Sequence, residues 1–307
     1  MSLYLGIDGG ATKTICVVGD ENNVLGTGTS GGCNVVRQGE AQARASLRAA
    51  ILQACGAAEV DPKQIASTCI GVAGGSVANV RDAVKRIIAD IVSGEVIVVG
   101  DNEIALEAAF LGRPGVIVAS GSGSIAYGRN EKGITARAGG HGFAISDEGS
   151  GYWIGRTAIT AALRAYDEGS EPQLLLQLAQ ALGASSRDEL VKVANGSTKP
   201  DFAALFPVVV RAADAKDLIA VDVLRRAAVE LAQLALIVAR KLWSKEEEEK
   251  IDVAIIGGVF QNSETVRKRF CEELKVVLPN ASVIQSVVDP AMGALERARK
   301  NLVEPRR

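Results

Sequence analysis

The feature that most constrains the fold is a glycine-rich turn near the start of the chain, with an apolar strand on each side. Residues 4–8 and 14–18 have the composition of buried strands, and the turn 9–13 (G-G-A-T-K) joins them. A third apolar segment, 24–29, follows a polar turn at 19–23. The chain is therefore predicted to open as a β-meander. A Rossmann domain would open as strand, turn and helix instead.

The order of elements in the first half of the chain recurs in the second half. Three landmarks match: strand, glycine turn and strand at 8–14 and 120–126; strand, Gly-Gly and helix at 70–80 and 254–265; strand, Asp and helix at 96–110 and 283–298. The shared order predicts an internal duplication of one α/β unit. A helical block at about 149–250 is inserted in the second half, and its segment 217–243 has strong helical periodicity.

Composition excludes several classes of function. The chain has 307 residues, of which 48% are hydrophobic, and a net charge of −2, so a general affinity for nucleic acid or an anionic membrane is not expected. It contains no apolar run long enough to span a membrane and does not begin with a signal-peptide pattern. A cytoplasmic protein is the expectation.

The cysteines and the histidine narrow the chemistry further. No C-x-x-C pair occurs, and reduced, buried thiols are predicted at the five cysteines: Cys16, Cys33, Cys55, Cys69 and Cys271. His141 is the only histidine, which excludes every mechanism that needs two. Acid–base chemistry is therefore assigned to carboxylates.

The first glycine turn has the residues of a phosphate and metal site. Gly9 and Gly10 let the backbone approach a ligand closely, and exposed N–H groups in such a turn bind anions. Thr12 adds a hydroxyl and Lys13 a positive charge. Asp8, at the end of the first strand, could hold Mg²⁺, which needs few carboxylates because it keeps several waters. A plain tight hairpin is the alternative interpretation.

Two segments of the second half also have the composition of ligand-binding turns. The run S-G-S-G-S at 120–124 can bind phosphate oxygens through N–H and hydroxyl groups. Gly257 and Gly258 follow an apolar strand and leave room for a flat ring. Each segment alone also fits an ordinary turn. In a duplicated fold, the turns at 9–13 and 120–124 are predicted to bind one polyphosphate together.

These three segments resemble the nucleotide motifs of the superfamily of actin, hexokinases and heat-shock chaperones. Residues 6–14 resemble its phosphate 1 motif, 118–124 its phosphate 2 motif and 254–260 its adenosine motif. The resemblance covers nearly the whole chain. It implies an α/β fold of duplicated ribonuclease H-like (actin-like ATPase) domains with a central cleft, and it implies ATP and Mg²⁺ as cofactors.

The same resemblance implies that the final helix returns to the first lobe. The expected division is an N-terminal lobe of residues 1–113 with 291–307, and a C-terminal lobe of residues 114–290. The helical block at about 149–250 belongs to the second lobe.

A narrower resemblance is to the N-acetylglucosamine kinases and the related benzoyl-CoA reductase-type (BadF/BadG/BcrA/BcrD-like) ATPases. It rests on G-G-H-G at 139–142 and D-E-G-S-G-Y-W at 147–153. The kinases usually have Trp where this chain has His141, a difference that bears on the substrate more than on the reaction. The resemblance implies ATP-dependent phosphorylation of the 6-hydroxyl of N-acetylglucosamine.

The resemblance also implies a role for individual residues. Asp101, which lies between a predicted strand at 95–99 and a predicted helix at 103–110, would be the general base, and Asp8 would hold the metal. The implied ATP-binding residues are Gly9, Gly10, Thr12, Lys13, Ser122, Gly123, Ser124, Gly257 and Gly258. The implied sugar-binding residues are Asn34, Ala73, Gly74, Asp101, Gly121, Gly140 and Asp147.

Three other functions stay open. Glucosamine is an alternative substrate. An ATPase that activates a redox enzyme would need cluster-binding cysteines in the second lobe, whereas the chain has none from residue 70 to residue 270. A non-catalytic sugar sensor is disfavoured by the joint presence of Asp8, Lys13 and Asp101. The expected partners are an amino sugar and ATP, with no nucleic acid or membrane, and the expected assembly is a homodimer.

Overall fold

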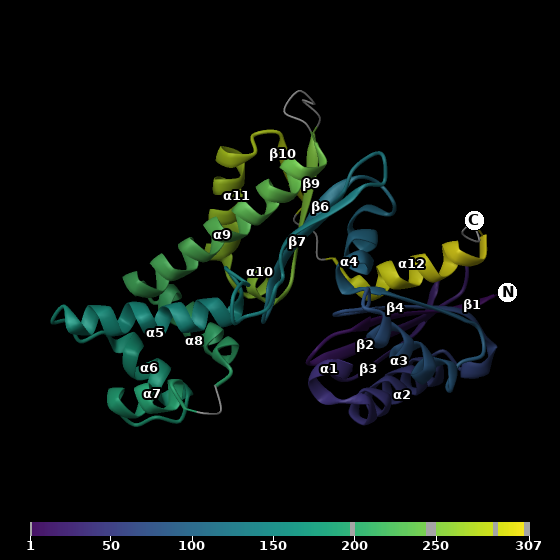
Figure 1. Cartoon of the computed structure of the whole chain (residues 1–307), viewed down its shortest axis with the longest axis horizontal. Coiled ribbons are helices and arrows are strands. Elements are labelled where there is room, and N and C mark those ends of the chain that lie inside the picture. Colours follow the sequence, from purple (N-terminus) through teal and green to yellow (C-terminus); the bar gives the residue numbers. More distant parts are fainter. Residues whose placement is uncertain (1, 197–199, 244–249, 285–287, 304–307) are drawn as a thin grey trace. The chain divides into compact units, whose positions relative to one another are not determined.

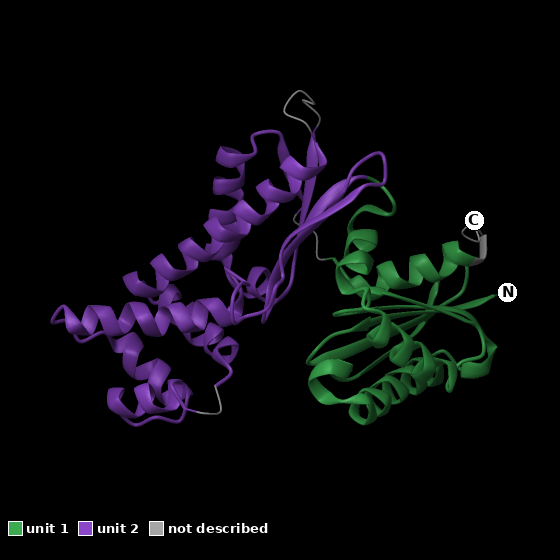
Figure 2. Cartoon of the chain, viewed as in Figure 1, with its two compact units in different colours: residues 1–113, 288–307 green, residues 114–287 purple. Residues whose placement is uncertain are grey.

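The chain folds into two compact units, seen here in a computed structural model that describes residues 2–196, 200–243, 250–284 and 288–303. Unit 1 comprises residues 1–113 and 288–307, and unit 2 comprises residues 114–287 (Figure 2). The sequence had placed the return to the first unit at residue 291. Each unit contains its own sheet and its own hydrophobic core.

The sheet of unit 1 has the strand order β3-β2-β1-β4-β5. Its strands are β1 (Leu3–Gly9), β2 (Lys13–Gly19), β3 (Val24–Gly31), β4 (Ile65–Val72) and β5 (Glu95–Gly100). Strands β1, β2 and β3 pair antiparallel, whereas β4 is parallel to β1 and β5 is parallel to β4. The predicted β-meander is therefore confirmed. Because β3 also runs in the direction of β1, four strands end at the same edge of this sheet.

The sheet of unit 2 repeats this topology. Its strands are β6 (Gly115–Ser120), β7 (Ser124–Arg129), β8 (Thr135–Gly139), β9 (Ile251–Ile256) and β10 (Ala281–Ile284). They are arranged in the order β10-β9-β6-β7-β8. Counted along each unit, the order in both sheets is third, second, first, fourth, fifth. The duplicated α/β fold predicted from the matched landmarks is thus confirmed.

Helices cover both faces of the first sheet (Figure 1). They are α1 (Val35–Gln38), α2 (Glu40–Ala57), α3 (Ala78–Ala89), α4 (Asp101–Phe110) and α12 (Pro290–Val303), with a 3₁₀ turn at Pro62–Gln64. Helix α2 buries Leu47 and Ile51, which recur at helical spacing, against the face that carries Leu5. Helices α4 and α12 pack on the opposite face through Ile104 and Leu295.

Unit 2 contains a block of helices between β8 and β9. Its helices are α5 (Gly151–Asp167), α6 (Gln173–Ala181), α7 (Arg187–Ala194), α8 (Phe206–Asp214) and α9 (Leu218–Leu242), with a 3₁₀ turn at Phe202–Leu205. Helix α9 packs against β6, β7 and β8, and α10 (Gly258–Asn262) and α11 (Glu264–Val277) follow β9. In the described part of the chain, no helix is long and apolar enough to span a membrane.

All five cysteines are reduced thiols outside any disulfide, as predicted. Cys16, Cys33, Cys55 and Cys69 are buried in unit 1, and Cys271 on α11 is half-buried. Burial raises the pKa of the Cys55 thiol to about 11, so it is protonated at neutral pH.

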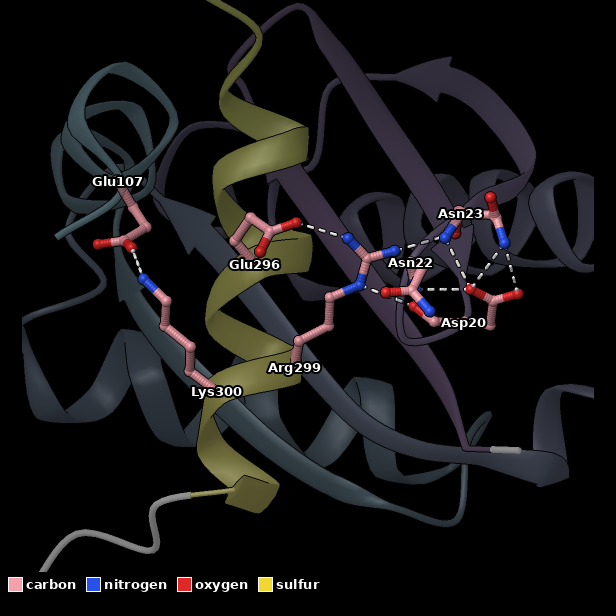
Figure 3. Close-up of polar contacts among 7 residues, drawn as sticks. All are labelled: Asp20, Asn22, Asn23, Glu107, Glu296, Arg299 and Lys300. Atoms are coloured by element: carbon pink, nitrogen blue, oxygen red, sulfur yellow. Dashed lines mark hydrogen bonds and ion pairs between the residues drawn. The ribbon is translucent and has the colours of Figure 1, made fainter.

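Helix α12 is fixed to the rest of unit 1 by polar contacts (Figure 3). The Nε of Arg299 donates to the carbonyl oxygen of Asp20 at 2.7 Å, and its Nη2 donates to the carbonyl oxygen of Asn23 at 2.9 Å. Lys300 pairs with the carboxylate of Glu107 on α4. The β2–β3 turn and α4 are therefore held to the same helix by charged side chains.

Replacing Arg299 with leucine should lower the free energy of unfolding. The variant keeps an apolar side chain but loses the charged donors to two backbone carbonyls, and each such hydrogen bond contributes about 1 kcal/mol. We expect a loss of about 1–3 kcal/mol in urea unfolding followed by circular dichroism. Arg86→Leu is a matched control, because Arg86 is 67% exposed and its contact with Glu40 is long, at 3.7 Å. Equal losses in both variants would contradict this role of Arg299.

Candidate functional site

The predicted phosphate turn of unit 1 is formed at the ends of β1 and β2. The N–H of Gly10 donates to the carbonyl oxygen of Lys13 at 3.0 Å, which closes the turn. The carbonyl oxygen of Gly10 accepts the N–H of Cys33 at 3.1 Å, so the turn is tied to the segment that leads to Asn34. Thr12 and Lys13 are exposed at its tip. Their hydroxyl and ammonium groups are available to an anion.

Three aspartates of unit 1 come close enough to interact electrostatically. Asp8 is the penultimate residue of β1, Asp101 is the first residue of α4, and Asp289 precedes α12. Burial, followed by repulsion from Asp101 and Asp289, raises the pKa of Asp8 to about 6, against the opposing effect of Lys13. A cation brought to this position would relieve that repulsion.

Asp289 was missed among the site residues predicted from the sequence. A signal was nevertheless present, because Asp289 precedes α12 after the fifth strand of unit 2, as Asp101 follows the fifth strand of unit 1. Its Oδ1 accepts the N–H of Ala291 at 3.0 Å, which fixes the carboxylate at the start of α12.

Asp101 combines a positioned carboxylate with access to solvent. Its Oδ1 accepts the N–H of Asn102 at 2.9 Å at the start of α4. Partial desolvation raises the pKa of its carboxyl, although the residue is still exposed. A carboxylate with a raised pKa is a better proton acceptor, and an exposed one can be reached by a substrate hydroxyl.

The unit 1 residues that are predicted to bind sugar lie at the same edge of the first sheet as Asp8. Asn34 follows β3, and Ala73 and Gly74 form an exposed turn after β4. The Oδ1 of Asn34 caps α1 by accepting the N–H groups of Val36 and Arg37, both at 3.0 Å. This cap leaves the amide nitrogen of Asn34 as the donor for a ligand. Asp8 lies near the end of β1, and Asn34, the 73–74 turn and Asp101 follow β3, β4 and β5. These four strands end together, which is where open α/β sheets bind ligands.

In unit 2, the glycine–serine turn and the D-E-G-S-G segment are joined by hydrogen bonds. The hydroxyl of Ser120 donates to the carbonyl oxygen of Gly149 at 2.9 Å, and that of Ser124 donates to the carbonyl oxygen of Glu148 at 2.7 Å. The N–H of Gly151 donates to the carbonyl oxygen of Gly121 at 2.7 Å. The Ser124 hydroxyl therefore has a structural partner, whereas Ser122 is exposed.

Asp147 is fixed within this arrangement. It is only 7% exposed and has φ of +68°. Burial raises the pKa of its carboxyl, against the opposing effect of hydrogen bonds from the N–H groups of Ser124 and Gly142. A Cβ at Gly123 would lie 2.9 Å from Oδ2 of Asp147, so only glycine lets the turn approach this carboxylate. Asp147 and the 121–123 turn therefore form one rigid feature.

Gly257 packs on the backbone of the same turn. It follows β9 with φ of +101°, and a Cβ there would lie 2.3 Å from the carbonyl oxygen of Ser120. Gly258 starts α10 directly after it, and Gly140, with φ of +70°, follows β8. Strands β6, β8 and β9 run in the same direction, so the turn, Gly140 and Gly257 share one edge of the second sheet.

His141 is exposed beside the sugar-motif residues. Its Nδ1 lies 3.3 Å from Nη2 of Arg137. Because a guanidinium only donates hydrogen bonds, Nδ1 is the acceptor in this contact.

Two units of the same topology, each with glycine-rich motifs at the edge where its parallel strands end, define an actin-like ATPase fold. The chain belongs to the BadF/BadG/BcrA/BcrD ATPase family, which it matches over residues 5–298. ATP is therefore its nucleotide.

Two curated relatives align over nearly their full length. An N-acetylmuramic acid/N-acetylglucosamine kinase from Clostridium acetobutylicum is 34% identical, over 97% of this chain and 99% of the relative. An N-acetyl-D-glucosamine kinase from Dictyostelium discoideum is 30% identical, over 95% of this chain and 96% of the relative.

Solved structures show the same fold. A candidate N-acetylglucosamine kinase from Chromobacterium violaceum superposes with a TM-score of 0.76 at 26% identity, over 96% of this chain and 98% of the other. A ROK family glucokinase from Streptomyces griseus has a TM-score of 0.64 at 18% identity, over 97% and 100% of the two chains.

Proposed function

We propose that the protein is a kinase that transfers the γ-phosphoryl group of ATP to the 6-hydroxyl of N-acetylglucosamine. The observation that carries the proposal is one edge of the first sheet, where Asp8 lies near the end of β1, Lys13 begins β2 and Asp101 follows β5. The two curated relatives, at 34% and 30% identity, support the reaction and the sugar.

Each unit supplies part of the ATP-binding groups. In unit 1 these are the backbone of Gly9 and Gly10 with the side chains of Thr12 and Lys13, and in unit 2 they are the N–H groups of Ser122 and Gly123 with the exposed Ser122 hydroxyl. Positioning and charge neutralisation are the main demands of phosphoryl transfer, so backbone donors and one ammonium group suit the task. Gly257 and Gly258 offer a surface without side chains to the adenine ring.

The residues present fit Mg²⁺ held together with ATP. In the described parts of the chain, no cluster of three or more His, Cys, Asp or Glu could cage a metal. Mg²⁺ takes one or two carboxylates and fills its other positions with water and substrate phosphates. Asp8 would hold it, directly or through water, and the ion would neutralise charge on the phosphate oxygens. Desolvation, together with repulsion from Asp101 and Asp289, raises the pKa of Asp8, and the repulsive part is consistent with a cation at this position.

The sugar would be oriented by the sugar-binding residues predicted in unit 1 and in unit 2, with Asp101 as the base. Asp101 accepts the proton of the 6-hydroxyl as the sugar oxygen attacks the γ-phosphorus, the bond from that phosphorus to the β,γ-bridging oxygen breaks, and ADP leaves. Asn34 donates through its amide nitrogen, the 73–74 turn lies alongside, and Asp147 accepts from a sugar hydroxyl. Gly121 and Gly140 allow the ring to approach the backbone.

The C. acetobutylicum relative is named for two sugars, and the second is also a candidate substrate here. N-acetylmuramic acid is N-acetylglucosamine with a lactyl ether at the 3-position, so it carries a carboxylate. It therefore needs both space and a positive charge beside the sugar. Arg156 and the pocket that it lines, next to the segment of Asp147, favour this candidate.

Sugar specificity tests the proposal. We expect kcat/KM for N-acetylglucosamine to exceed that for glucosamine and glucose by at least tenfold, since a site that pairs with the acetamide leaves groups unpaired when it is missing. Coupled ADP release, measured with each sugar at saturating ATP, gives the three values. If glucosamine is preferred by tenfold, the acetamide is not recognised and Asp147 or Glu148 binds the ammonium instead.

A further inference from the structure

Unit 2 contains a pocket of about 440 Å³ between α5 and α7. This volume is within the range of about 300–1,000 Å³ that is usual for small-molecule sites. One wall is formed by Phe143 and Ala144, which belong to the same segment as Gly140 and Asp147. The pocket is therefore continuous with the segment assigned to sugar binding.

The pocket has a rigid apolar floor. The ring of Phe143 lies 4.7 Å from that of Tyr152, and Tyr152 meets Phe202 edge-on at 5.3 Å. Helix α5 adds Ile159 and Leu163 on the face that carries Tyr152. Aromatic contacts of this kind hold the three rings in place, so the shape of the pocket is built into the fold.

Arg156 is an exposed residue that lines this pocket and places a positive charge beside its apolar floor. Its carbonyl oxygen accepts the hydroxyl of Thr160 at 3.1 Å, but among the described residues no carboxylate forms a salt bridge with its guanidinium. The side chains of two other arginines of unit 2 do have partners. Arg187 pairs with Asp188 at 2.7 Å and covers Tyr166, and Arg226 lies over Trp153. Arg156 therefore keeps its planar donors for a ligand.

The distance from the sugar motif to Arg156 is short. Ala144 is three residues from Asp147, so their Cα atoms are at most about 11 Å apart. The N–H of Ser150 donates to the carbonyl oxygen of Asp147 at 3.1 Å, and α5 begins at the next residue. Arg156 is one helical turn beyond Tyr152, and side chains on a helix lean towards its N-terminus. Arg156 lines the same pocket as Phe143 and Ala144, which belong to the sugar-motif segment.

We propose that this pocket is a subsite for a carboxylate-bearing substituent of the sugar, with Arg156 as its counter-ion. The inference rests on the proposed kinase function and adds a determinant of specificity to it. The apolar floor accepts the carbon atoms of a short substituent, and the guanidinium binds its carboxylate through paired N–H donors. The lactyl ether of N-acetylmuramic acid has this chemistry. A free carboxylic acid would offer the same groups without the sugar.

Arg156→Gln tests the subsite, with Arg164→Gln as the matched control. Arg164 is an exposed arginine on the same helix and does not line the pocket. We expect Arg156→Gln to lower both kcat/KM and calorimetric affinity for N-acetylmuramic acid by about tenfold to a hundredfold, the effect of losing charge-assisted hydrogen bonds. The kcat/KM and affinity of Arg156→Gln for N-acetylglucosamine should stay within about twofold of wild type. Arg164→Gln should leave both quantities unchanged for both sugars.

The outcomes separate the subsite from the kinase function. If the wild type phosphorylates N-acetylglucosamine but neither binds nor phosphorylates N-acetylmuramic acid, or if Arg156→Gln affects both sugars equally, the subsite is refuted and the kinase proposal stands. If neither sugar is phosphorylated, the kinase proposal fails, and the calorimetric comparison still decides the subsite. A third outcome is that lactate binds to the wild type and not to Arg156→Gln, while the variant has no effect on N-acetylmuramic acid. That result would refute the sugar subsite and assign the pocket to a separate carboxylic acid.

Discussion

Asp101→Asn is expected to lower kcat by about 10²- to 10⁴-fold, the usual contribution of a general base. Asparagine keeps the shape of the side chain, and its Oδ1 can still accept the N–H of Asn102, which is 2.9 Å from the aspartate oxygen. The fold and the sugar contact should therefore persist while the proton acceptor is lost. We expect KM for the sugar to change by less than about fivefold, because the loss is confined to the transition state.

Asp61→Asn is the matched control for this variant. Asp61 is an exposed aspartate of unit 1 that also accepts backbone N–H groups at a helical turn, at 2.8 Å from the nitrogen of Lys63. Its replacement should leave kcat unchanged. If Asp101→Asn keeps near-normal turnover, another group is the base, and Asp147 becomes the next candidate.

Asp8→Asn should slow turnover by about a hundredfold and increase the Mg²⁺ concentration needed for half-maximal rate. The variant removes the carboxylate assigned to the metal, whose contribution to phosphoryl transfer is several kcal/mol. Melting temperature separates this effect from misfolding. Asp8 is half-buried and repelled by Asp101 and Asp289, so neutralising it should not lower the melting temperature.

The metal requirement can be measured directly on the wild type. Activity should vanish in excess EDTA and return when Mg²⁺ is restored. Turnover that survives in EDTA would exclude the metal assignment, and an Asp8→Asn variant with the wild-type Mg²⁺ dependence would transfer it to another residue.

The architecture could be predicted from the sequence because its signals are local. Short strands rich in apolar residues, glycine turns and the helical spacing of Leu47 and Ile51 each indicate their own element. The order of these elements then revealed the duplication. The predicted start of α4 was wrong by two residues, since the helix begins at Asp101 and not at Glu103. The carboxylate of Glu103 accepts the N–H of Gly100 at 3.1 Å, and this contact stabilises the extra residues of the first turn.

Parts of the site depend on contacts that the sequence does not display. The hydroxyls of Ser120 and Ser124 bond to carbonyl oxygens 29 and 24 residues away, which joins two motifs that appear separate in the sequence. The proximity of Asp289 to Asp8 likewise arises only when α12 folds onto unit 1. The stack of Phe143, Tyr152 and Phe202 needs three elements to meet before its pocket exists.

The most direct test of the kinase function is identification of the product. The protein, incubated with ATP, Mg²⁺ and N-acetylglucosamine, should release one ADP for each sugar phosphorylated. Phosphorus and proton NMR should then show a phosphomonoester on the 6-oxygen. Release of ADP with inorganic phosphate and no phosphorylated sugar, or a phosphate on another hydroxyl, would contradict the account.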